Sequence, residues 1–215
     1  MFGTQNVGLF LITALVLNAT PGVDLLLTLT RTLQGGMRAG FAAALGIGCG
    51  CIVHTLAAAL GLAALLAASA LAFTLVKWLG AAYLLWLAFG MLRSALRGTP
   101  QDSLAVTTAA GPAPWRAIFA QGFLTNVLNP KVALFFLALL PQFIAADAPS
   151  KPLAFLFLGG LFVVNGMLFL CAVVLAANSA CRIATGARAR RLVNGGGGVL
   201  FALLAARLAL ADRAS

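Results

Sequence analysis

Two short segments carry the residues whose types and spacing could do chemistry. The first is NATPGVD at residues 18–24, and the second is NVLNPK at residues 126–131. Each places a proline near the middle of an apolar run. Proline lacks an N–H and clashes with the carbonyl four residues back, so it breaks or kinks a helix. The carbonyls freed in this way would be those of Leu17 and Asn126.

The residue before each proline predicts that a new helix begins there. Thr20 before Pro21, and Asn129 before Pro130, each resemble an N-cap followed by proline at the first helical position. A half-helix would then restart near the membrane centre, with free N–H groups and a positive dipole end that attract carboxylates. The alternative is a simple kink, because proline and glycine are common in membrane helices.

Two charged residues lie in the same segments. Asp24 is the only carboxylate inside an apolar run, and Lys131 is the only base deep in the run around the second proline. Ionisable residues inside a membrane are costly and usually mark a pathway. A zwitterionic amino acid would offer its ammonium to Asp24 and its carboxylate to Lys131 and the half-helix ends, and either side chain could exchange a proton. The alternative is a structural ion pair. The expected substrate-binding residues are Thr20, Pro21, Gly22, Asp24, Asn126, Asn129, Pro130 and Lys131.

Other polar residues in apolar runs are weaker candidates. His54, the only histidine, could relay protons together with Asp24 or could bond to a neighbouring helix. Asn18 and Asn165 could bridge helices or contact a ligand, and Gln142 could be a gate or a plain helix boundary. The sequence contains no Ser-His-Asp order, metal cluster or Glu pair, so we expect no enzyme, no cofactor and no metal site.

The composition identifies the elements that must position these residues. Apolar residues make up 62% of the 215 residues and charged residues 8%, against about 45–50% and about 25% in soluble domains. Both values exclude a soluble globular domain, a disordered chain and a coiled coil. Six apolar runs of about 20 residues predict an all-α integral membrane protein with six spans. The expected spans cover residues 7–29, 40–66, 71–92, 117–140, 153–177 and 193–210.

The basic residues predict the orientation of these spans. Most of the 14 Lys and Arg residues follow the first, third and fifth spans, and positive residues stay cytoplasmic, so both termini should lie outside the cytoplasm. The net charge of +10 is therefore a topology signal, and no nucleic-acid partner is expected. One transporter domain over 1–215 would hold a repeat at about 7–92, a cytoplasmic loop at 93–116 and an inverted repeat at about 117–210. In such folds the site lies at the midplane between the repeats.

Small residues recur every four positions in the second predicted span. We interpret them as surfaces for close helix packing, which could also form the interface of a homodimer. One stripe is Ala42, Gly46 and Gly50, and the other is Gly40, Ala44 and Gly48.

The main alternative function is a membrane thiol–disulfide electron relay, also built on inverted triple-span repeats. It needs reactive cysteines near the breaks in both halves. Cys49 and Cys51 share one span and, at this spacing, point to different helix faces. A secondary exporter is favoured, and direct ATP drive is not expected because no GxxxxGK[ST] run is present.

Four segments make the sequence similar to the LysE/RhtB family of amino-acid exporters. They are TPGVD at 20–24, GGMRAGFAAALGIGCGCIVHTLAAALGLAALL at 35–66, VKWLGAAYLLWLAFGMLRS at 76–94 and GFLTNVLNPKVALFFLALLPQF at 122–143. The resemblance implies a six-span exporter of amino acids or their derivatives in the bacterial inner membrane, operating by antiport with protons. Five residues fall on the family's recurrent positions: Pro21, Gly22, Asn129, Pro130 and Lys131. The sequence departs at Val23, where the family usually repeats proline, and position 24 often carries Asn in the family.

Overall fold

The structure is a computed structural model. It describes residues 2–62 and 114–179, together with single helical residues between 74 and 96 and between 199 and 206. The predicted spans 71–92 and 193–210 and the predicted loop 93–116 therefore lie largely outside the described residues. The described part is all-helical, and its only strand-like contact is an isolated bridge between Thr4 and Ile144.

The first predicted span is broken at its proline. Helix α1 covers Val7–Ala19 and helix α2 begins at Val23 and covers Val23–Ala57. Helix α2 is bent at Gly35 and Gly36, and Gly36 adopts a φ of 69°, which glycine reaches without the steric penalty of a side chain. The start of α2 thus lies in the first predicted span, and the rest of α2, followed by the π-helical turn η1 (Ala58–Leu62), lies in the second. The connection between these spans is shorter than the sequence predicted.

The fourth predicted span is broken in the same way. Helix α5 ends at Val127, three residues before Pro130, and the two halves of the predicted span meet at a bend of 44°. Helix α7 corresponds to the fifth predicted span, and its bounds lie within two residues of those predicted. The elements of this half are α5 (Trp115–Val127), α6 (Pro130–Leu134), the π-helical turn η2 (Phe135–Leu139), the 3-10 turn η3 (Leu140–Phe143) and α7 (Lys151–Ser179).

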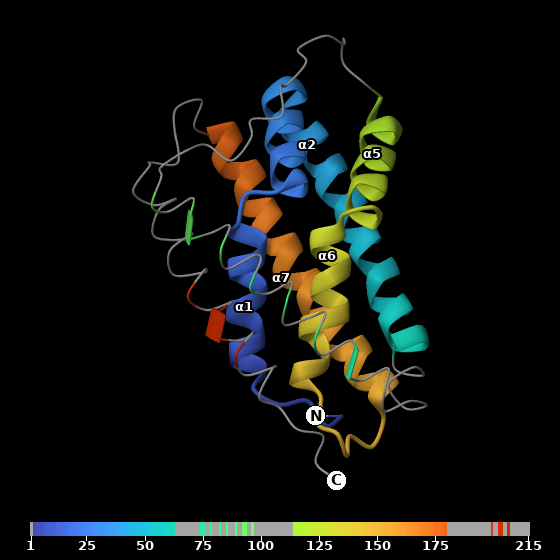
Figure 1. Ribbon diagram of the computed structural model, residues 1–215. Coiled ribbons are helices and arrows are strands. Elements are labelled where there is room, and N and C mark those ends of the chain that lie inside the picture. Colours follow the sequence, from blue (N-terminus) through green and yellow to red (C-terminus); the bar gives the residue numbers. More distant parts are fainter. Residues whose placement is uncertain are drawn as a thin grey trace.

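The two broken spans run in opposite directions. Helix α1 leads away from the N-terminus, whereas α5 and α6 lead back towards it (Figure 1). Backbone bonds join the start of one span to the end of the other: Gln5 N–H donates to Phe143 O at 2.8 Å, and Ala145 N–H donates to Gly3 O at 2.8 Å. The described part therefore contains an antiparallel pair of broken helices.

Glycines of α2 bring its backbone against α5. A Cβ at Gly46 would collide with the Phe119 carbonyl oxygen, and a Cβ at Gly122 would collide with the Ala43 carbonyl oxygen. A Cβ at Gly50 would come within 2.7 Å of Asn126 Oδ1. The stripe that contains Gly46 and Gly50 is therefore a helix-packing surface, as the sequence predicted.

The second stripe of α2 packs on α7. A Cβ at Gly48 would lie 2.6 Å from Met167 Sδ and one at Gly40 would lie 3.0 Å from Val174 Cγ2. Both stripes are thus occupied by helices of the same chain. The suggestion that these glycines form an interface between protomers is wrong for the faces that touch α5 and α7.

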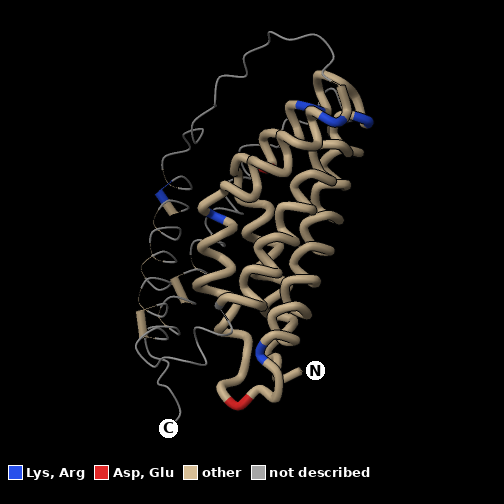
Figure 2. The backbone as a smooth tube through the Cα atoms, turned by 90° about the vertical axis from the view of Figure 1, so that its right-hand side faces the viewer, with Lys and Arg blue, Asp and Glu red and all other residues tan. Residues whose placement is uncertain are grey.

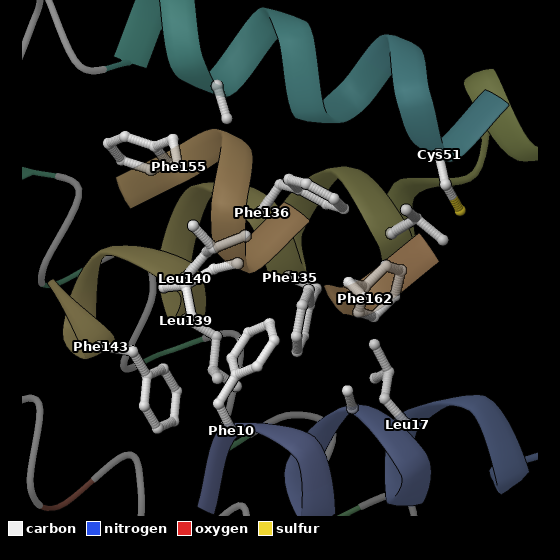
Figure 3. Packing of buried hydrophobic residues seen from close by; sticks show 14 of the residues in the cluster. Phe10, Leu17, Cys51, Phe135, Phe136, Leu139, Leu140, Phe143, Phe155 and Phe162 are labelled. Atoms are coloured by element: carbon white, nitrogen blue, oxygen red, sulfur yellow. The ribbon is translucent and has the colours of Figure 1, made fainter. Parts of the chain in front are cut away.

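Aromatic side chains fill the space between α1, α6, η2, η3 and α7 (Figure 3). The Phe10 ring meets the Phe143 ring edge-on with centroids 5.3 Å apart, and the Phe135 and Phe162 rings lie 4.6 Å apart. All four side chains are at most 1% exposed. We call this group the phenylalanine cluster; it occupies the half of the bundle nearer the N-terminus.

Charged residues concentrate at the ends of the helices. Basic residues gather at the end far from the N-terminus, where α2 bends and α5 begins (Figure 2). There, Arg31 Nε and Nη2 donate to Gln121 Oε1 at 3.0 and 2.6 Å, which joins α2 to α5. Between the ends, the segments Val23–Gly61 and Lys151–Ala177 are long and apolar enough to cross a membrane, and the bent pair α5–α6 passes as a third span.

Candidate functional site

The break in the first span is built differently from what the sequence predicted. Thr20 ends α1 instead of beginning the next helix: its N–H and its Oγ1 both donate to Val16 O, at 2.9 and 2.7 Å. Gly22, in an extended conformation, is the N-cap of α2. The prediction that Thr20 is an N-cap is wrong because a threonine hydroxyl can return to the carbonyl four residues back. A new helix nevertheless begins after the break, at Val23.

Lys131 reaches across from the other broken span to the end of α1. Its Nζ donates to Leu17 O at 2.7 Å and to Thr20 O at 2.9 Å. Leu17 O is the carbonyl that Pro21 was predicted to free. The lysine therefore satisfies the backbone group exposed by the break.

Asp24 lies in the first turn of α2 and is held by two asparagines of the other span. Asn126 Nδ2 donates to Asp24 Oδ2 at 2.8 Å, and Asn129 Nδ2 donates to the same oxygen at 3.1 Å. A carboxylate is also stabilised at a helix N-terminus by the dipole. The second break thus supplies the partners of the carboxylate at the first.

Asn129 is the N-cap of α6, as predicted. Its Oδ1 accepts from Lys131 N–H at 3.0 Å, with Pro130 at the first helical position. The two atoms of the Asn129 amide therefore have different partners: the oxygen caps α6, and the nitrogen donates to Asp24. Replacing this side chain would disturb both the break and the carboxylate.

The second freed carbonyl also receives a basic side chain from the other half. His54 Nε2 lies 3.1 Å from Asn126 O, and the His54 ring stacks on Phe136 with centroids 5.8 Å apart. Asn129 N–H donates to the same carbonyl at 2.9 Å. The expectation that His54 bonds to a neighbouring helix is therefore confirmed.

These groups surround a cavity of about 40 Å³, which is room for a few water molecules. Six of the eight expected substrate-binding residues line it, whereas Pro21 and Pro130 do not, and neither does His54, the expected proton relay. A Cβ added at Gly22 would lie 3.4 Å from Lys131 Nζ. The absence of a side chain at Gly22 therefore leaves room for the lysine ammonium. The lining residues that the sequence predicted are Thr20, Gly22, Asp24, Asn126, Asn129 and Lys131.

Two residues that line the cavity carry a buried acceptor atom without a donor. Asp24 Oδ1 and Asn126 Oδ1 are both buried and have no hydrogen-bond partner within the described part of the chain. An unpaired buried acceptor is costly. A ligand that fits here must therefore present N–H or O–H donors.

Part of the wall was not predicted. Helix α7 contributes Phe162, Gly166 and Met167, and the signal that could have found it is Asn165, which accepts from Asn18 Nδ2 at 3.2 Å. The helix-bridging interpretation of these two asparagines is confirmed, and Asn18 also lines the cavity.

The structure also places Gln142 and the described cysteines. Gln142 lies in η3, where its Nε2 donates to Ala138 O at 3.0 Å. The cysteines at 49, 51 and 171 are free, and Cys51 lines the cavity. Among the described residues, no group of three or more His, Cys, Asp or Glu side chains could hold a metal ion.

A protein-family model described as "LysE type translocator" matches residues 15–212. This chain belongs to the LysE translocator family. The "Homoserine/homoserine lactone efflux protein" of Salmonella typhimurium is 33% identical over 205 residues, covering 95% of this chain and 96% of the relative. The protein of the same name from Salmonella typhi has the same identity and coverage. An "Uncharacterized membrane protein" of Vibrio cholerae is 37% identical over 150 residues, 70% of each chain. No solved structure matches.

The family resemblance seen in the sequence is thus confirmed. LysE translocators are transporters, and together with the apolar helices this makes the chain a multi-pass integral membrane protein. The thiol–disulfide alternative has no support from the named relatives or from the described cysteines.

Proposed function

We propose that this LysE translocator is a secondary exporter of amino acids or amino-acid derivatives across the bacterial inner membrane. The relatives named for homoserine and homoserine lactone efflux support this substrate class. Homoserine and its lactone are both small polar molecules that carry a primary ammonium group.

The proposed substrate site is the cavity between the two broken spans. The observation that carries it is that two residues of the cavity lining hold unpartnered buried acceptors, Asp24 Oδ1 and Asn126 Oδ1. A substrate ammonium supplies the donors that these oxygens lack, and a carboxylate–ammonium hydrogen bond is among the stronger kinds. Pro21 and Pro130 create the breaks that bring the polar groups to this depth.

The proposed architecture is a single domain of six spans in two inverted repeats, at about 7–92 and 117–210. The opposite directions of α1 and α5–α6 support it (Figure 1). We assign the basic end of the bundle to the cytoplasm, because positive residues stay on that side. Both termini then lie outside.

We further propose that export is coupled to protons through Asp24 and His54. Asn126 connects the two: its carbonyl faces His54 Nε2 and its amide donates to Asp24. A proton and a substrate ammonium would compete for the same carboxylate oxygen. Such competition is the simplest basis for antiport.

The proposed cycle uses the two ends of the bundle alternately. In this cycle the phenylalanine cluster closes the cavity towards the N-terminal end: Phe162 belongs to both the cluster and the cavity lining, and Leu17 of the lining packs in the same hydrophobic core. Release to the outside requires these rings to part. Access from the cytoplasm lies on the side of Arg31 and Gln121.

The test is efflux of preloaded radiolabelled L-homoserine from vesicles that contain the purified protein. We expect protein-dependent efflux that accelerates when the vesicle exterior is made acidic and slows when an ionophore collapses the proton gradient. Vesicles without protein give the passive leak. Efflux no faster than the leak would contradict the export proposal, and efflux indifferent to the ionophore would contradict the coupling.

A further inference from the structure

Lys131 is the only cationic side chain among the described residues that line the cavity. Its natural assignment is therefore the partner of a substrate carboxylate. The hydrogen bonds indicate a different role, because its ammonium already points to backbone carbonyls of the opposite repeat.

Those carbonyls form the C-terminal end of α1, which carries negative partial charge. Pro21 has no N–H to offer Leu17 O, and α1 ends before another backbone donor can reach it. In a membrane an unsatisfied carbonyl costs several kcal/mol. A lysine that left to bind a carboxylate would expose this group.

The carboxylate of Asp24, in contrast, lacks a hydrogen-bond donor on one of its oxygens among the described residues. Asp24 Oδ2 accepts two amide N–H groups, whereas Asp24 Oδ1 accepts none. The positive end of α2 is already faced by Asp24 itself, which lies in its first turn. Asp24 Oδ1 therefore needs a cationic donor, whereas Lys131, the one cationic side chain in the described lining, already donates to backbone carbonyls.

We propose that Lys131 is a positioning residue that caps the broken end of α1 from the other repeat, and that the substrate is held by its ammonium at Asp24 without a carboxylate partner at Lys131. Derivatives whose carboxyl group is blocked, such as lactones and amides, are then held in the same way as free amino acids. This inference rests on the proposed export function and the proposed site.

Three related probes separate the roles of ammonium and carboxylate: L-homoserine, L-homoserine lactone and N-acetyl-L-homoserine. Their efflux is measured from vesicles containing the wild-type protein, with protein-free vesicles for subtraction. We expect homoserine and its lactone to have KM values within about tenfold of each other. N-acetyl-homoserine, which lacks the ammonium, is not exported.

The variant Lys131→Met keeps most of the length of the side chain but has no ammonium to donate to the carbonyls, and Lys131→Arg keeps the charge. We expect Lys131→Met to lower the maximal rate for both exported probes with the ratio of their KM values unchanged, and Lys131→Arg to recover part of the rate. Loss of a charge-assisted bond to a carboxylate would instead raise the KM of homoserine about 10- to 150-fold and leave that of the lactone unchanged. That outcome would overturn the assignment.

Binding gives a second measurement that does not require transport. The shift in the melting temperature of detergent-purified protein is recorded with each probe, for wild type and for Lys131→Arg in case Lys131→Met does not fold. Stabilisation by homoserine but not by its lactone would overturn the inference. If wild type exports no probe, the export proposal fails, and equal stabilisation by homoserine and lactone would still support the role assigned to Lys131.

Discussion

The substitution Asp24→Asn removes the charge of the proposed ammonium site and keeps the shape of the side chain. An asparagine at this position retains one oxygen, which can still accept from Asn126 and Asn129 as Asp24 Oδ2 does at 2.8 and 3.1 Å. Its amide nitrogen then replaces the unpartnered Oδ1. A donor would thus face the substrate's donors where an acceptor stood before.

The expected effect follows from the one bond that is lost. A hydrogen bond to a charged group contributes about 1.5–3 kcal/mol, which corresponds to about a 10- to 150-fold change in affinity. The opposed amide N–H adds a repulsion, so we expect the upper part of this range. The protein should fold, because the retained oxygen keeps its hydrogen bonds from Asn126 and Asn129.

The assay is the concentration dependence of homoserine efflux from vesicles, with equal amounts of folded protein verified by gel filtration. Asp147→Asn is the matched control: it removes the same charge from an exposed position outside the cavity lining, and we expect its KM to equal that of wild type. If Asp24→Asn leaves KM within about twofold of wild type, the carboxylate does not bind the substrate.

Three other predictions concern the breaks, the packing and the cavity. Asn129→Ala removes a cap and should lower the free energy of unfolding by about 1–2 kcal/mol, whereas Asn129→Ser keeps a capping oxygen and should recover much of it; melting temperatures in detergent compare them. Gly46→Ala drives a Cβ into the Phe119 carbonyl and should destabilise by about 1–3 kcal/mol, whereas Gly160→Ala has open space and should not; an equally stable Gly46→Ala would contradict the backbone contact. In a variant whose other cysteines are serine, homoserine should slow alkylation of Cys51, which lines the cavity; an unchanged rate, measured by mass spectrometry, would place the substrate elsewhere.

Local chemistry explains what the sequence predicted correctly. Proline removes one backbone donor wherever it occurs in a helix, so the breaks at Pro21 and Pro130 and the orphaned carbonyl of Leu17 follow from the sequence alone. The Asn129 cap also depends only on residues two positions apart.

Partners far apart in the chain could not be predicted in this way. The bond from Asn126 to Asp24 spans 102 residues, and that from Lys131 to Leu17 spans 114. The sequence indicated that Asp24 and Lys131 face one site, but their partners depend on how two antiparallel breaks align. Thr20 was assigned wrongly for a local reason: two competing bonds are open to its hydroxyl, and the choice depends on where α1 stops.

The glycine contacts between α2 and α5 have a consequence for how the repeats move. Where Gly46 and Gly122 bring one backbone against another, no side chains stand between the helices to slide, bend or change rotamer. In the proposed cycle, where one repeat rocks against the other, the α2–α5 contact would therefore be the pivot, and displacement would increase with distance from it.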